Sequence, residues 1–137
     1  MGFLLRIVLA TALLNLAPAV AGAPKKAVAS PALQKEFDGF IEKFRAALKI
    51  NDSAAVAGMT RLPFMNDSAI GDAAQFRAKT YADFFTAKNR ACIQRGKAVY
   101  DPDQSNHDNY VVVCGDDIFV FTKTPEGFLF TDISAND

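Results

Sequence analysis

The chain has 137 residues, of which 50% are hydrophobic, and its 15 basic and 15 acidic residues give a formal net charge of zero. A balanced charge without a clustered positive surface argues against nucleic acid or an anionic membrane as the main partner, because both favour basic clusters. The length is sufficient for one domain with a genuine core and too short for two.

Residues 1–21 have the pattern of a secretory signal peptide. Arg6 gives a positive start, residues 7–16 form an apolar run, and small residues follow up to Ala21, where we expect cleavage. The apolar run is about half of the roughly 20 residues that a membrane-spanning helix needs, so an uncleaved anchor is the less favoured alternative. We therefore expect a periplasmic or secreted protein that has no membrane association after cleavage.

Residues 22–30 are rich in small residues and lysine and are expected to form a flexible linker. A single domain is expected over residues 31–137. Ser30 and Pro31 favour a helix start, because a hydroxyl can cap free N–H groups and proline needs no hydrogen bond at the first position. Apolar residues then recur every three or four positions, which predicts an amphipathic helix over 31–49, with Gly39 on its polar side.

The sequence Asn-Asp-Ser-Ala occurs at 51–54 and again at 66–69. Each copy contains a glycosylation acceptor, but short polar side chains of this kind are also typical of helix N-caps, and we favour the cap interpretation. The first copy predicts a short helix. Residues 61–65 are expected to form an edge strand or a crossing loop, a third helix is predicted over 73–88, and residues 91–93 are expected to lead towards the sheet.

Four antiparallel strands are predicted in the C-terminal part. A first strand at 97–100 precedes a polar loop, and residues 108–133 contain three apolar runs separated by two tight turns. Strict alternation along the last run places Asp132 on the same face as Phe128 and Phe130. Both sheet faces are apolar, so we expect helices to cover one, and a partner, a second copy or the curvature of the sheet to cover the other.

Cys92 and Cys114 are the two cysteines of the chain. In an oxidising compartment such a pair most simply forms one disulfide, worth on the order of 3 kcal/mol for a loop of this length. Two separately buried thiols are the alternative. A metal or redox role is not expected, since there is no CxxC motif and His107 is the only histidine.

The order of elements is a long helix, a short helix, a crossing segment, a further helix and a curved antiparallel sheet. The residues that carry this pattern are Phe37, Phe40 and Phe44, then Leu62-Pro63-Phe64, then Ile118-Phe119-Val120-Phe121, and finally residues 125–133. Over about residues 31–133 the chain resembles the NTF2-like superfamily, also called the cystatin-like α+β cone, and in particular its secreted bacterial members of unknown function.

This resemblance implies an α+β fold in which N-terminal helices pack on a strongly curved antiparallel sheet of about four strands. It also implies a conical pocket open at one end. Members of the superfamily include ketosteroid isomerase-like and polyketide cyclase-like enzymes as well as proteins that only bind ligands or proteins, so the fold alone does not settle the function.

Four side chains are candidates for a pocket. Asp132 can act as a general base if an apolar pocket desolvates it and raises its pKa, although a strand-end aspartate in water is the plainer interpretation. Tyr81 and Tyr110 can donate hydrogen bonds to a ligand, or lie in the core with a wet hydroxyl. Arg61 can meet an anionic ligand at the mouth of the cone, or lie on the surface.

The polar loop around His107 is the remaining candidate. Ser105, His107 and Asp108 are neighbours on one loop, whereas catalytic triads are assembled from positions that the fold brings together. The oxygen-rich residues 101–108 suit a hard cation but lack the glycine and glutamate of an EF-hand, so we interpret them as a polar hairpin loop. We expect no metal and no cofactor.

The sequence thus predicts an exported, non-catalytic binding domain. Its ligand is expected to be a small apolar molecule or a protein partner, held in a conical apolar pocket or on an apolar sheet face, and a homodimer through the sheet is one form of this prediction. The alternative is a small ketosteroid isomerase-like or dehydratase-like enzyme with Asp132 as general base.

Overall fold

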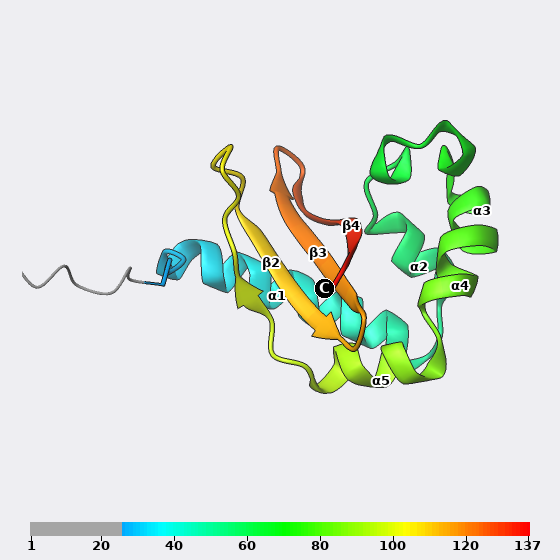
Figure 1. The fold of residues 1–137 in the computed structure, drawn as a ribbon, viewed down its shortest axis with the longest axis horizontal. Helices are drawn as coiled ribbons and strands as arrows, with labels where there is room; N and C mark the ends of the chain where they lie inside the picture. The colour runs from blue at the N-terminus through cyan, green and yellow to red at the C-terminus, as the bar shows by residue number, and fades with distance from the viewer. Residues whose placement is uncertain (1–25) are drawn as a thin grey trace, which may run out of the picture.

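The computed structural model describes residues 26–137 (Figure 1). The predicted signal peptide and residues 22–25 of the predicted linker lie outside the described residues. Residues 26–30 have no regular secondary structure. Within the described part of the chain, no helix is both long enough and apolar enough to cross a membrane.

Helix α1 spans Pro31–Lys49, with the bounds that the sequence predicts. The Ser30 hydroxyl accepts a hydrogen bond from the Leu33 N–H (3.2 Å) and so caps the first turn. One face of α1 is buried against the rest of the protein, and its buried residues are Phe37, Ile41, Phe44, Ala47 and Leu48.

Both Asn-Asp-Ser-Ala copies form helix caps. The side chain of Asp52 accepts from the Ala55 N–H at the start of α2, and the side chain of Asp67 accepts from the Ala69 N–H. The cap interpretation of these repeats is therefore confirmed. The elements of this region are α2 (Ser53–Gly58), η1 (Phe64–Asn66) and η2 (Ser68–Ile70).

The predicted third helix over 73–88 is interrupted near its end, at residues 85–86. The chain leaves the helical conformation at Phe85, because the Thr86 hydroxyl caps a new helix by accepting from the Asn89 N–H (3.2 Å). The break lets the Phe85 ring enter the core, where it is 2% exposed. Residues 91–93 consequently lie inside a helix. The elements are α3 (Ala73–Phe76), a π-helical turn η3 (Arg77–Tyr81), α4 (Ala82–Phe84) and α5 (Ala87–Arg95).

The sheet contains four antiparallel strands in the order β1-β2-β3-β4 and is not closed. Its helices cover one face, with α1 running behind β2 and β3 in Figure 1. The predicted α+β class is therefore confirmed. Gly115 and Gly127 take positive φ angles at the two tight turns, as glycine does most readily. The strands are β1 (Val99–Tyr100), β2 (Asn109–Cys114), β3 (Asp117–Thr124) and β4 (Gly127–Ala135).

A β-bulge in β4 overturns the predicted position of Asp132. Phe121 pairs with Phe130, but the next residue of β3, Val120, pairs with Asp132, so Thr131 is an extra residue in the ladder. Cross-strand partners share a face, and one extra residue reverses the alternation that follows it. Asp132 therefore lies on the outer face, opposite to Phe130.

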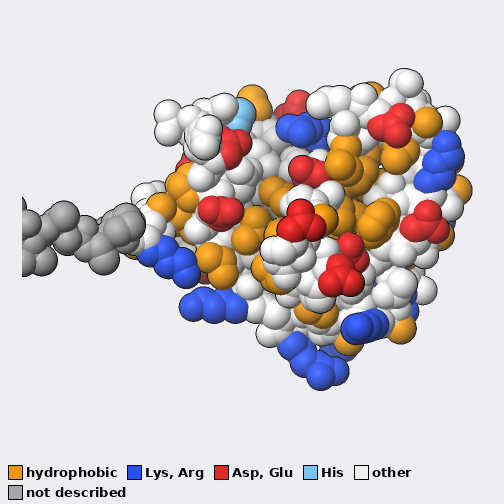
Figure 2. Space-filling model, viewed as in Figure 1, with side chains coloured by type: hydrophobic (Ala, Val, Ile, Leu, Met, Phe, Trp, Pro, Cys, Tyr) orange, Lys and Arg blue, Asp and Glu red, His pale blue; other side chains and the backbone are white. Residues whose placement is uncertain are grey.

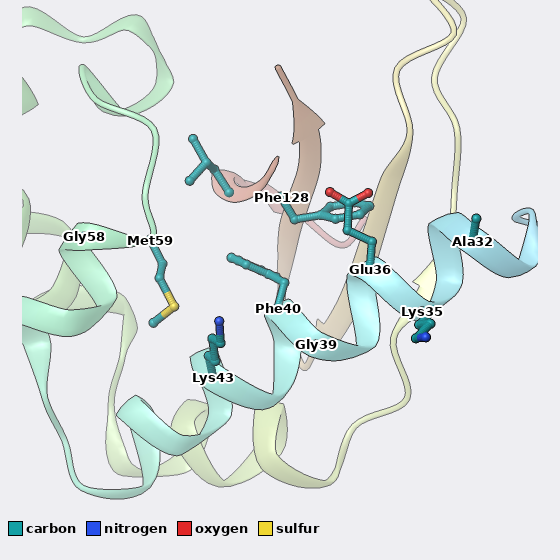
Figure 3. A pocket seen from close by; sticks show the side chains of 10 residues that line it. Ala32, Lys35, Glu36, Gly39, Phe40, Lys43, Gly58, Met59 and Phe128 are labelled. Carbon is teal, nitrogen blue, oxygen red and sulfur yellow. The ribbon is translucent and has the colours of Figure 1, made fainter. Parts of the chain in front are cut away.

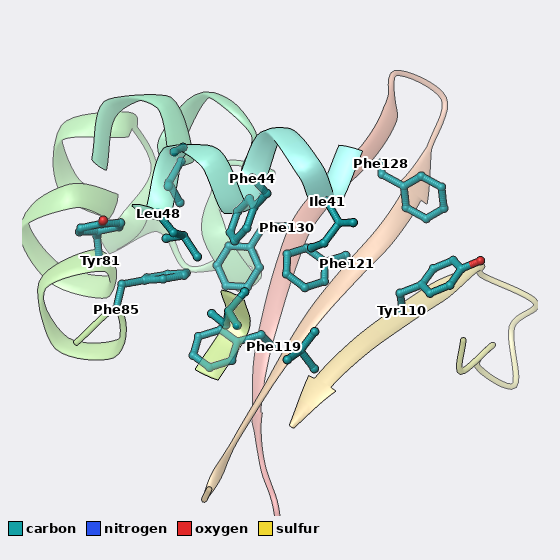
Figure 4. Close-up of a cluster of buried hydrophobic side chains, with 14 of the residues drawn as sticks. Ile41, Phe44, Leu48, Tyr81, Phe85, Tyr110, Phe119, Phe121, Phe128 and Phe130 are labelled. Atoms are coloured by element: carbon teal, nitrogen blue, oxygen red, sulfur yellow. The ribbon is translucent and has the colours of Figure 1, made fainter. Parts of the chain in front are cut away.

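Aromatic rings fill the space between α1 and the sheet (Figure 4). Phe130 lies at the centre of this packing, with the Phe64, Phe85 and Phe121 ring centroids at 5.1, 5.4 and 5.6 Å from its own. The three pairs are stacked, edge-on and tilted respectively, and aromatic pairs at such distances are favourable beyond the area that they bury. The interior that a cone would offer to a ligand is thus occupied by the protein's own phenylalanines.

A disulfide joins Cys92 of α5 to Cys114 at the end of β2, with the two Cα atoms 5.9 Å apart. The predicted bridge is confirmed and the alternative of two free thiols is excluded. The end of α5 is also bonded to α1, because the Arg45 guanidinium of α1 donates to the carbonyl oxygens of Ile93 (2.9 Å) and Gly96 (2.7 Å).

Candidate functional site

A groove of about 620 Å³ lies between one face of α1, the end of α2 and the beginning of β4 (Figure 3). This volume falls within the range of roughly 300–1,000 Å³ that is typical of small-molecule sites. The residues that line the groove are Ala32, Lys35, Glu36, Gly39, Phe40, Lys43, Gly58, Met59, Phe128 and Leu129.

The groove follows directly from the spacing of residues on α1 and from the course of the chain after α2. The α1 positions in the lining recur every three or four residues and so form one stripe beside the buried face. On the opposite side, the Phe130 N–H donates to the Met59 carbonyl (2.8 Å), which holds Met59 next to β4. Phe40, Met59 and Leu129 are half-buried, so the lining presents apolar surface to solvent.

Two glycines keep the groove wide. A Cβ atom added at Gly39 or at Gly58 would meet nothing within 4 Å, and neither residue takes the positive φ that favours glycine. Glycine inside a helix costs roughly 1 kcal/mol relative to alanine. Gly39 therefore lowers the stability of α1 without a backbone or packing reason of its own, and its structural effect is open space in the groove.

The groove has an unpaired ammonium group within it and an ion pair beside it. Glu36 of α1 pairs with Lys123 of β3, and the Lys123 nitrogen also lies 6.0 Å from the Phe128 ring centroid. In Figure 3 the Lys43 ammonium points towards the apolar side chains, whereas Lys35 points away from them. Among residues 26–137, no carboxylate lies within ion-pair distance of Lys43.

A second, smaller cavity of about 180 Å³ lies on the outer face of the sheet, and we call it the polar pocket. It forms where the bulge turns Asp132 outwards and where the loop between β1 and β2 folds over the strands. The residues that line it are Arg61, Asp103, His107, Asn109, Val120, Thr122, Thr131 and Asp132.

Backbone and side-chain hydrogen bonds order the loop beside the polar pocket. Asp103 accepts from the backbone N–H groups of Ser105 and His107 and from the His107 ring, and the backbone bond from His107 is the main cause of a lowered Asp103 pKa. The Tyr100 hydroxyl donates to Asp108 (2.6 Å), and this bond raises the pKa of Tyr100 to about 12. Within the described chain, no group of three or more His, Cys, Asp or Glu side chains is placed to hold a metal ion.

The structure places two of the four candidate side chains in the core and the other two in the polar pocket. Tyr81 and Tyr110 are buried core residues, with hydroxyl groups that donate to Asn51 Oδ1 (2.7 Å) and Gln34 Oε1 (2.8 Å), and neither lines the groove or the polar pocket. They are core residues because each ring stacks on a phenylalanine. Arg61 and Asp132 do come together, but in the polar pocket and not in the apolar groove.

Sequence reasoning missed the residues that form the groove. Gly39, Lys43 and Met59 carry no motif, and they meet only because α1 and the segment after α2 both pack against β4. The one available signal was a glycine on the solvent side of a strongly amphipathic helix. Such a glycine lowers helix stability, and it therefore indicates a position where the missing side chain leaves open space beside the helix.

The outer sheet face mixes apolar and acidic side chains, and Lys and Arg gather along the lower edge of the molecule (Figure 2). Of the strand residues in the described chain, only Val113 is a large hydrophobic residue with a strongly exposed side chain (50%). Isolated apolar residues of this kind are normal on protein surfaces.

The fold is that of an α+β domain with helices on one face of an open antiparallel sheet, and it carries both the groove and the polar pocket. Comparisons with protein-family models, with curated proteins and with solved structures found no match. The resemblance to the NTF2-like superfamily therefore stays a prediction.

Proposed function

We propose that this protein is an exported, non-catalytic binding domain whose groove holds an elongated apolar molecule with an anionic end. The observation that carries the proposal is an apolar groove in which two glycines leave space and a lysine has no partner among the described residues. The order of the elements favours a place in the NTF2-like superfamily, which includes proteins that only bind ligands.

The apolar part of the ligand is inferred from the groove lining. Phe40, Met59 and Leu129 are half-buried and lose further contact with water when an apolar chain covers them. Burial of apolar surface contributes roughly 25 cal/mol per Å². Methionine adapts its shape easily, so Met59 suits a flexible ligand better than a rigid one.

The anionic end is inferred from Lys43. Its ammonium group is directed towards the apolar side chains (Figure 3), where an approaching ligand displaces water and strengthens a charge-assisted hydrogen bond. Glu36 does not compete for Lys43, because Lys123 already pairs with it. A fatty-acid-like carboxylate has both required parts.

Export is supported by the disulfide and by the sequence of residues 1–21. Disulfides persist in oxidising compartments and are rare in the cytosol of most organisms. Purification from cell fractions, followed by mass determination, tests this part of the proposal. A cytosolic protein that retains residues 1–21 would contradict it.

The binding proposal is tested with decanoate, decanol and decyltrimethylammonium in calorimetry and in NMR titrations of the full exported chain. We expect decanoate to bind most tightly, with saturable shifts at groove residues. Lys43→Gln should remove the preference for decanoate over decanol, whereas Lys97→Gln, a matched control at an exposed position outside the groove lining, should leave it unchanged.

A steric variant tests the location of the site independently. Gly39→Leu places a side chain in the open space and should abolish decanoate binding, whereas Gly39→Ala should retain most of it. Decanoate binding that is unaffected by Gly39→Leu would place the ligand elsewhere. No saturable shift in the wild-type protein would contradict the proposal itself.

The two other functions expected from the sequence receive less support. The general-base hypothesis requires Asp132 in an apolar pocket, but Asp132 does not line the groove. A homodimer through the sheet stays a prediction, which sedimentation equilibrium can test.

A further inference from the structure

One carboxylate oxygen of Asp132 is buried without a hydrogen-bond partner. Oδ1 of Asp132 is the one side-chain oxygen or nitrogen among residues 26–137 that is buried and unsatisfied. An unsatisfied buried polar atom is unfavourable, and in native structures such atoms call for a specific explanation, such as a bound ligand or ion. Asp132 also lines the polar pocket, so its carboxylate borders the space that a donor can enter.

The polar pocket is built on two buried hydroxyl groups. Thr131 is 2% exposed and Thr122 is 9% exposed, and their hydroxyl oxygens lie 2.7 Å apart. The Thr122 hydroxyl donates to Asn109 Oδ1 (2.7 Å), and the Asn109 amide nitrogen faces Asp103 Oδ2 (3.5 Å). The Thr131 hydroxyl also has the Val120 carbonyl oxygen within reach (3.3 Å), so each hydroxyl has an acceptor inside the protein for its one proton.

These hydrogen bonds fix the chemical character of the pocket floor. Both threonine protons are used inside the protein, so the two hydroxyl groups can offer only lone pairs to a ligand. The Asp132 carboxylate is likewise only an acceptor when it is ionised. The floor therefore lacks donors and presents acceptors beside a negative charge, which is the environment that a cationic hydrogen-bond donor requires.

The size and the rim of the polar pocket limit the ligand further. About 180 Å³ corresponds to the volume of roughly six water molecules at about 30 Å³ each, so the ligand is small. Arg61 contributes to the lining and forms no ion pair with another described residue. His107 lies at the rim, with its Nδ1 atom 2.8 Å from Asp103 Oδ2.

From this geometry we infer that the polar pocket is a second binding site, which takes the ammonium group of a small primary amine. The Asp132 carboxylate accepts from the ammonium group, and the Thr122 and Thr131 hydroxyl groups offer further acceptors. An amine that also carries a carboxylate, as an amino acid does, additionally meets Arg61. This inference does not depend on the groove, which has a different lining and the opposite ligand charge.

The test is an NMR titration of the full exported chain with ethanolamine and with glycine. Ethylene glycol, which lacks the charge, and tetramethylammonium, which lacks the N–H donors, are the controls. We expect saturable shifts of the Asn109, Thr122 and Thr131 amide signals with ethanolamine and weaker, non-saturable ones with both controls. Tighter binding of glycine, lost in Arg61→Gln, would assign the carboxylate to Arg61.

Variants separate ligand binding from folding. Asp132→Asn keeps the side-chain shape and should weaken ethanolamine binding at least about tenfold, because the charge-assisted bond is lost. Asp116→Asn, at an exposed position of the β2–β3 turn, is the matched control and should leave the affinity unchanged. Thr131→Val is a second variant of the floor and should also weaken binding, with the spectrum of each variant showing that it is folded.

Three results would overturn the inference. The first is the absence of saturable shifts with either amine in the folded wild-type protein. The second is an unchanged affinity in Asp132→Asn. The third is an identical response to potassium chloride, which would assign the pocket to inorganic cations. Decanoate titrations of the same samples report on the groove separately, so failure of one proposal leaves the other measurable.

Discussion

The Phe37 ring of α1 lies parallel to the Tyr110 ring of β2, with ring centroids 3.7 Å apart and planes inclined by 3°. Both rings are buried, and the Tyr110 hydroxyl donates to Gln34 of the same helix that carries Phe37. The first helix is thus joined to the second strand by one stacked pair and one side-chain hydrogen bond. These contacts connect residues that lie far apart in the sequence, so they form only when the whole domain folds.

Removing the ring of Phe37 should therefore destabilise the whole domain. We expect Phe37→Ala to lower the free energy of unfolding by about 3–5 kcal/mol, as for other buried phenylalanines, and Tyr110→Phe to lower it by about 1 kcal/mol through the lost hydrogen bond. Urea unfolding followed by circular dichroism measures both. A loss below about 1 kcal/mol for Phe37→Ala would show that the stack is not part of the cooperative core.

The Cys92–Cys114 bridge should stabilise the folded chain through the loop that it closes. The two residues are 22 positions apart, and the chain-entropy relation gives about 3 kcal/mol for a loop of this length. We expect Cys92→Ala combined with Cys114→Ala to lower the free energy of unfolding by about this amount. A thiol reductant should have the same effect on the wild-type protein and none on the double variant, which serves as the control.

Two glycines should respond in opposite ways to the same substitution. Gly39→Ala should raise the free energy of unfolding by about 0.5–1 kcal/mol, because alanine favours the helix and its methyl group enters open space. Gly96→Ala should lower it by about 1–3 kcal/mol, because the new Cβ atom would lie 2.8 Å from the Cys92 oxygen and 2.9 Å from Val112 Cγ1. Equal effects in thermal unfolding would contradict this assignment.

The three tyrosines should titrate above their ordinary range. The hydrogen bond to Asp108 raises the pKa of Tyr100 to about 12, and burial raises the pKa values of Tyr81 and Tyr110. A raised pKa means that folding favours the protonated hydroxyl. This stabilisation is fully present below the unfolded pKa of about 10 and is lost as the pH rises through the folded values.

Phenolate absorbance against pH measures this shift directly. The native curve should lie at higher pH than the curve in denaturant, and Tyr100→Phe should reduce the loss of stability between about pH 10 and pH 12. Coincident native and denatured curves would show that these hydroxyl groups are exposed to water in the folded protein and would contradict the prediction.

Much of the fold can be predicted from the sequence because its signals are local. The bounds of α1 follow from Ser30, Pro31 and a strict apolar repeat, and the two strand turns follow from Gly115 and the Pro125–Gly127 segment. The third helix could not be delimited in this way. A continuous helical pattern was interrupted by Thr86, whose cap competes with helix continuation and gains from the burial of Phe85.

The candidate sites were harder to predict, for two different reasons. The face of Asp132 depends on a bulge at Thr131, and alternation carries no signal of an inserted residue. The groove depends on the absence of side chains at Gly39, inside α1, and at Gly58, at the end of α2. Neither property is encoded in a motif, and both arise from the way in which α1, the segment after α2 and β4 come together.

The backbone contact between residues 59–61 and β4 has a consequence for behaviour at high concentration. The Phe130 N–H and carbonyl are both occupied, by Met59 and Arg61 respectively, at the middle of the outer edge of β4. The opposite edge of the sheet is a strand of only two residues, Val99–Tyr100. Unpaired strand edges are the templates on which fibrils grow, and very short or covered edges resist this. The protein should therefore withstand edge-to-edge polymerisation despite a core rich in phenylalanine.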